Sequence, residues 1–132
     1  MNKYKNKTCL IVDDYNTARD IIKKSILEIG LNVIEAENGE QALSIITKKS
    51  LDLVISDYQM PLKNGLKLLE NIRNDDVLNN IPFILMLIEP YEHIISQAKK
   101  LGMNDYIVKP FDVFTLSKVL DKVLPSDSGE SL

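Results

Sequence analysis

Four charged side chains come at the ends of three short apolar runs that lie far apart in the chain: Asp13, Asp14, Asp57 and Lys109. If these runs are parallel strands of one sheet, their carboxyl ends meet at the edge where ligands bind in folds of this kind. Three carboxylates gathered there would repel one another and raise the pKa of at least one, unless a cation offsets the charge. Lys109 can supply part of that offset, and a divalent cation the remainder.

The donor atoms in this set are hard oxygens, and the set contains no histidine or cysteine. Such a set prefers Mg²⁺ to zinc or copper, and Mg²⁺ commonly takes one or two carboxylates together with phosphate oxygens. A carboxylate beside such a metal and a lysine can attack phosphorus to form an aspartyl phosphate. The pattern therefore predicts a Mg²⁺-dependent phosphoryl site.

Each of these residues also has an ordinary interpretation. Aspartates that follow strands often stabilise turns or cap helices, and Asp14 alone would be such a residue. Asp57 alone, or Lys109 alone, would be an ordinary surface charge. The joint pattern, in which each charge closes a separate predicted strand, favours a functional site.

Five apolar runs rich in Val, Ile and Leu have the length of strands, and their hydrophobicity is continuous rather than alternating. That pattern is typical of strands covered on both faces. They lie at residues 8–13, 31–36, 52–57, 83–87 and 105–109.

Apolar residues at helical spacing separate these runs and follow the last of them. The first stripe contains Ala18, Ile21, Ile22, Ile26 and Ile29, and the others fall within 42–46, 66–72, 94–101 and 116–123. Each stripe is expected to pack on the sheet. Strict alternation of strand and helix predicts an α/β fold, a doubly wound five-stranded parallel sheet with five helices.

Length and composition indicate one domain. With 132 residues, 45% of them hydrophobic, we expect a domain over 1–124 and a flexible tail or truncated linker over 125–132. The net charge of −3, without a basic stripe, argues against a nucleic-acid partner. We expect a cytoplasmic protein without membrane insertion, because no apolar run has the length of a signal peptide or a membrane span.

Three motifs together resemble the receiver domains of two-component response regulators, and among them the CheY-like single-domain chemotaxis regulators. They are IVDD at 11–14, SDYQMPLKNG at 56–65 and NDYIVKPF at 104–111. The resemblance spans residues 6–124. It implies a flavodoxin-like sheet with strand order 2-1-3-4-5.

The resemblance also implies roles for individual residues. Asp57 would be the phosphoacceptor, a phosphoprotein site that receives its phosphoryl group from a phosphohistidine on a histidine kinase. Asp14, Asp57 and the backbone carbonyl of Gln59 would bind Mg²⁺ directly, and Asp13 mainly through water. Lys109 and Asp13 would be the catalytic residues, and the peptide bond after Lys109 would be cis.

Further positions would tune and transmit the signal. Gln59 and Glu89 would adjust hydrolysis of the phosphoryl group, and Tyr106 would be the aromatic switch. The output target would bind the face made by the helices near 94–101 and 116–123 and the strand 105–109. We expect a monomer, with dimerisation through that same face left open.

One part of the family's pattern is missing. Leu87 stands where receivers carry a Thr or Ser that donates to a phosphoryl oxygen, and Ile88 stands where a small residue is usual. A leucine has no hydroxyl to donate, and a β-branched Ile88 should narrow access to Asp57. We expect phosphorylation to persist but its coupling to Tyr106 to be weak.

These two residues keep a second function open: a pseudo-receiver, an interaction domain that acts independently of phosphorylation. A third class is an enzyme with its own substrate, which we do not expect. A flavodoxin-type FMN protein needs a Ser/Thr/Gly-rich phosphate loop, whereas the first strand is followed by DDYNTAR. An aspartyl phosphatase needs alternate acidic residues, whereas Asp13 and Asp14 are adjacent.

Overall fold

The computed structural model describes residues 3–124 and contains one parallel sheet in the order β2-β1-β3-β4-β5. The strands are β1 (Thr8–Val12), β2 (Asn32–Ala36), β3 (Leu53–Asp57), β4 (Phe83–Leu87) and β5 (Asp105–Val108). The doubly wound fold and its strand order are therefore as expected. The predicted tail at 125–132 lies outside the described residues.

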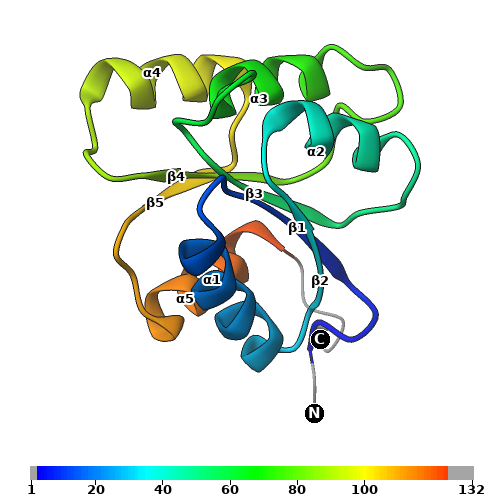
Figure 1. Ribbon diagram of the computed structural model, residues 1–132, viewed down its shortest axis with the longest axis vertical. Helices are drawn as coiled ribbons and strands as arrows, with labels where there is room; N and C mark the ends of the chain where they lie inside the picture. Colours follow the sequence, from blue (N-terminus) through cyan, green and yellow to red (C-terminus); the bar gives the residue numbers. More distant parts are fainter. Residues whose placement is uncertain (1–2, 125–132) are drawn as a thin grey trace.

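Helices cover both faces of the sheet, with α2, α3 and α4 on one side and α1 and α5 on the other (Figure 1). Their bounds are α1 (Asn16–Ile29), α2 (Gly39–Ile46), α3 (Gly65–Arg73), α4 (Glu92–Leu101) and α5 (Val113–Val123). Because both faces are covered, every residue of β3 and β4 is buried, and these strands have no solvent-facing positions.

Strand β4 illustrates how alternate residues serve two cores. Phe83, Leu85 and Leu87 belong to the core under α2, α3 and α4. Ile84 and Met86 belong to the core under α1 and α5. All five are buried, which explains why this run reads as an unbroken apolar segment.

Short-range capping interactions define where several helices begin. The side chain of Asn38 accepts from the N–H of Gln41 at 2.8 Å, and Asp112 accepts from the N–H of Thr115 at 2.8 Å. Such caps satisfy N–H groups that lack partners within the helix. Gly102 ends α4 with a φ of 99°, a left-handed conformation that glycine adopts without strain.

The predicted buried stripe of α1 is wrong at one position. Ile21 is 61% exposed, whereas Arg19, Ile22 and Ile26 are the buried residues of this helix. They recur at intervals of three and four residues, so one helical face points to the sheet. An arginine occupies the first position of this face, which apolar periodicity alone could not identify.

No helix formed by residues 3–124 has both the length and the apolar character that a membrane span requires.

The loop after β3 holds Leu62 in a strained conformation. Leu62 has a φ of 70° although it is 82% exposed and gains little from packing. The left-handed region costs an L-residue other than Gly, Asn or Asp about 1–2 kcal/mol. Replacing Leu62 with Asn should therefore raise the free energy of unfolding by about 1 kcal/mol, measured by urea denaturation.

The matched control is Val77→Asn, because Val77 is also exposed but has no positive φ. It should give no comparable gain. Equal effects of the two substitutions would contradict the assignment of strain to Leu62.

Candidate functional site

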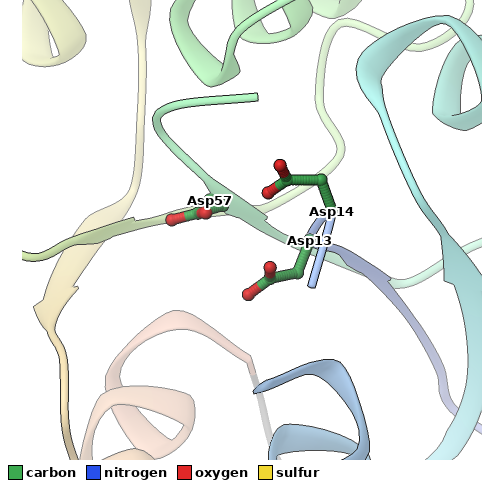
Figure 2. Close-up of side chains that lie close together, drawn as sticks. All are labelled: Asp13, Asp14 and Asp57. Carbon is green, nitrogen blue, oxygen red and sulfur yellow. The ribbon is translucent and has the colours of Figure 1, made fainter. Parts of the chain in front are cut away.

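The strand order places the ends of β1 and β3 side by side. Val12 is paired with Ser56, so Asp13 and Asp57 follow at adjacent positions of the two strands. Figure 2 shows Asp13 and Asp14 leaving the end of β1 on opposite sides, with Asp57 across from them at the end of β3. Carboxylate oxygens of all three residues lie within 4.8 Å of one another. The predicted convergence of the three aspartates is confirmed.

Asp13 is the most enclosed of the three. Its side chain is fully buried, with Oδ2 accepting from Lys109 Nζ at 2.9 Å and Oδ1 accepting from the N–H of Tyr15 at 3.0 Å. Both carboxylate oxygens are therefore engaged.

Lys109 bridges two of the carboxylates, because its Nζ also lies 3.3 Å from Asp57 Oδ1. The backbone of Lys109 continues the pairing of β5 with β4, since its N–H donates to the carbonyl of Leu87 at 2.8 Å. Burial by itself would lower the pKa of Lys109, but Asp13 and Asp57 outweigh it, so that the pKa is raised. The peptide bond between Lys109 and Pro110 is cis, as expected.

Asp57 lies at the bottom of the site. Burial, assisted by repulsion from Asp13 and Asp14, raises the pKa of its carboxyl even though Lys109 acts in the opposite direction. The close approach of Gly65 accounts for part of the enclosure, because a Cβ there would lie 2.5 Å from the backbone oxygen of Asp57. Only glycine lets α3 begin this close to the end of β3.

Asp14 supplies the evidence that the site suits a metal. Its Oδ1 is buried and has no hydrogen-bond partner among residues 3–124. A buried carboxylate oxygen without a partner is costly, and a cation satisfies it. The three carboxylates and the ammonium of Lys109 leave an excess of two negative charges. A divalent cation with a preference for oxygen, such as Mg²⁺, fits both the charge and the donor atoms.

A cleft of about 600 Å³ opens over Asp14 and Asp57. Gln59 and Glu89, the expected hydrolysis-tuning residues, are exposed on its wall. Ile88 also lines the cleft and is 67% exposed, so its side chain borders the entrance as expected.

The predicted switch residues lie deeper in the protein. Leu87 lines the cleft yet is only 2% exposed, because its side chain belongs to the core under α2, α3 and α4. Tyr106, on β5, is half-buried against that same core and does not line the cleft. The cleft thus has an aliphatic side chain, that of Leu87, at the end of β4.

The sequence did not reveal one buried residue beside the site. The Nη1 of Arg19 donates to the backbone oxygen of Asp13 at 2.7 Å. The only sequence signal for the burial of Arg19 was its position three residues before Ile22, on the buried face of α1.

Comparisons with known proteins agree with this geometry. The family model described as "Response regulator receiver domain" matches residues 9–121. Chemotaxis protein CheY-3 of Vibrio cholerae is 41% identical over 120 residues, which cover 90% of this chain and 92% of that protein. A CheY homolog of Campylobacter jejuni is 38% identical over 123 residues, covering 92% and 95% of the two chains.

Solved structures give the same result for the fold. The structure of chemotaxis protein CheY4 of Vibrio cholerae has a TM-score of 0.86 at 28% identity, and the match covers 90% of this chain and 99% of that one.

The raised pKa of Asp57 has a consequence for stability. An aspartate whose pKa is higher in the folded than in the unfolded protein opposes folding once it is ionised. Without Mg²⁺, Asp57→Asn should therefore be more stable than wild type at pH 7, and this difference should shrink as the pH falls through the folded pKa of Asp57. Urea unfolding of wild type and Asp57→Asn, at pH 7 and at a pH below the folded pKa of Asp57, measures this difference.

Saturating Mg²⁺ serves as the control, because it should stabilise the wild type more than Asp57→Asn and reduce the difference. If Asp57→Asn were less stable than wild type at pH 7 without Mg²⁺, the ion pair of Asp57 with Lys109 would contribute more to stability than burial of the Asp57 carboxylate costs.

Proposed function

The chain belongs to the family of response regulator receiver domains, and on that premise we propose that it accepts a phosphoryl group on Asp57 from a phosphohistidine of a histidine kinase. The observation that carries this proposal is the constellation at the sheet edge. Lys109 bridges Asp13 and Asp57, while Asp14 presents a buried oxygen without a partner. In this proposal Asp57 is the phosphoacceptor, Asp14 belongs to the cation site and Lys109 is the catalytic lysine.

In the proposed transfer, a carboxylate oxygen of Asp57 attacks the phosphorus atom. The bond between phosphorus and the histidine nitrogen breaks, and the imidazole keeps the electron pair. Lys109, which lies 3.3 Å from Asp57, then pairs its ammonium with the phosphoryl oxygens and continues to contact Asp13. Burial of Asp57 limits the access of water to the carboxylate during the transfer.

The metal ligands in this proposal are Asp13, through water, Asp14, Asp57 and the backbone carbonyl of Gln59. A bound Mg²⁺ would neutralise charge on the transferring phosphoryl group. Gln59 and Glu89, exposed on the wall of the cleft, are placed where they could orient or exclude the water that later hydrolyses the aspartyl phosphate. We expect no turnover of an independent substrate.

Partners follow from the family. We propose a histidine kinase as phosphodonor and a protein output target that binds the face of α4, β5 and α5. The relatives named as chemotaxis proteins support a role in chemotaxis. In this proposal the domain acts as a monomer.

Phosphorylation of Asp57 can be tested with a labelled phosphohistidine donor in the presence of Mg²⁺. Wild type should acquire label that is stable to acid and labile to hydroxylamine, as an acyl phosphate is. Asp57→Asn should acquire none, and chelation of the metal should abolish labelling of wild type.

Asp76→Asn is the matched control, because Asp76 is an exposed aspartate outside the site and its loss should leave labelling unchanged. Equal labelling of Asp57→Asn and wild type would exclude Asp57 as the acceptor.

A second function is favoured by Leu87. Its side chain is buried in the apolar core against which Tyr106 also packs. Losing a hydrogen bond to a charged phosphoryl oxygen would remove roughly 1.5–3 kcal/mol of stabilisation of the phosphorylated form. The alternative proposal is therefore a pseudo-receiver, a protein-interaction domain whose surface does not respond to phosphorylation.

Beryllofluoride, which mimics a phosphoryl group on aspartate, separates the two functions. In wild type with Mg²⁺, we expect NMR shift changes near Asp57 but only small changes around Tyr106. In Leu87→Thr, the hydroxyl can donate to the bound group, and the changes should extend to Tyr106 and α4.

Leu87→Val is the control, because it also shortens the side chain but adds no hydroxyl. A wild-type response that extends fully to Tyr106 would refute the pseudo-receiver.

A further inference from the structure

Arg19 is a buried charge that the proposed transfer does not use. Within residues 3–124 it is the only basic side chain in the buried class, which otherwise contains the polar residues Asp13, Ser56 and Asp57. A buried guanidinium is costly unless its N–H groups are paired. The positions of its partners therefore indicate what it does.

Each nitrogen of the Arg19 guanidinium donates to a different segment. Nη1 donates to the backbone oxygen of Asp13 at 2.7 Å, and Nη2 donates to Oδ1 of Asn16 at 2.6 Å. Nε donates to Oε1 of Glu35 at 3.0 Å. The planar group thus joins the end of β1, the start of α1 and strand β2. A lysine could not reproduce this fork, because its donors radiate from one atom.

The contact with Asp13 involves the peptide group that links Asp13 to Asp14. On the other side of Asp13, its N–H donates to the carbonyl of Ala36 at 3.1 Å. Residues 13–15 belong to neither helix nor strand, and Tyr15 caps α1 without a side-chain hydrogen bond. The orientation of this peptide plane therefore depends on Arg19, and the plane in turn sets the direction of the Asp14 side chain.

Asp14 needs such support because its buried Oδ1 has no protein partner. An unpaired carboxylate among like charges would turn toward solvent if its backbone were free to rotate. We propose that Arg19 is a positioning residue for the metal site. Arg19 holds the Asp13–Asp14 peptide so that the carboxylates of both residues are preorganised for Mg²⁺. This inference rests on the Mg²⁺ binding in the proposed function.

Lys23 provides a matched comparison. It lies on the same helix and pairs with the other oxygen of the same carboxylate, Glu35 Oε2, at 3.1 Å. Its side chain is far more exposed than that of Arg19, and no contact joins it to Asp13 among the described hydrogen bonds. Removing Lys23 deletes a positive charge paired with Glu35 and leaves the Asp13–Asp14 peptide untouched.

The experiment is calorimetric titration of Mg²⁺ into wild type, Arg19→Lys, Arg19→Met and Lys23→Met, each checked for cooperative unfolding. Loss of positioning should raise the Kd for Mg²⁺ about 10-fold in both Arg19 variants, as expected for residues that orient metal ligands. Lys23→Met should stay within about 2-fold of wild type. If Arg19→Met acted only by removing a charge, the Kd for Mg²⁺ should fall, because deleting a nearby cation should tighten Mg²⁺ binding.

The outcomes are distinct. No Mg²⁺ binding by wild type would overturn the proposed function and this inference with it. Binding by wild type together with an unchanged Kd in folded Arg19 variants would overturn only the inference. If the Arg19 variants do not fold, the inference is tested on the wild type alone. Mg²⁺ should slow the exchange of the Arg19 Nε proton with solvent, because coupling between Arg19 and the Mg²⁺ site acts in both directions. Unchanged exchange would overturn the inference.

Discussion

Repulsion among three carboxylates held within 4.8 Å at the ends of β1 and β3 is the constraint around which the site is arranged. Lys109 lies against two of them and offsets part of the charge. Asp14 is left with a buried, unpartnered oxygen. This partly unbalanced cluster costs energy in the free protein, and a bound divalent cation would relieve that cost.

The backbone and the side chain of Leu87 have separate roles in the structure. Its backbone oxygen accepts from the N–H of Lys109, a contact that any residue can supply, and this contact extends the pairing of β4 with β5. Its side chain, by contrast, enters the core on the α2, α3 and α4 face. Leucine at this position therefore supports Lys109 through its backbone and gives the cleft an aliphatic wall.

Much of the fold and of the charged site could be predicted, because each rests on a local pattern. Continuous apolar runs identified the strands, and their final residues identified Asp13, Asp57 and Lys109. The prediction failed at Ile21, where the apolar periodicity of α1 gave no weight to a buried arginine. The left-handed backbone of Leu62 was also beyond reach, since leucine carries no preference for that conformation.

By itself the sequence determined the order of strands and helices along the chain and the residue types at the strand ends, because hydrophobic period and residue type are local properties. Only the tertiary structure decided the contacts of the site. Lys109 and Asp13 are 96 positions apart, and the 2.9 Å between their charged atoms depends on the sheet order and on the register of four strands. The same holds for Arg19, because its partners Asp13, just after β1, and Glu35, on β2, become neighbours only when the sheet has formed.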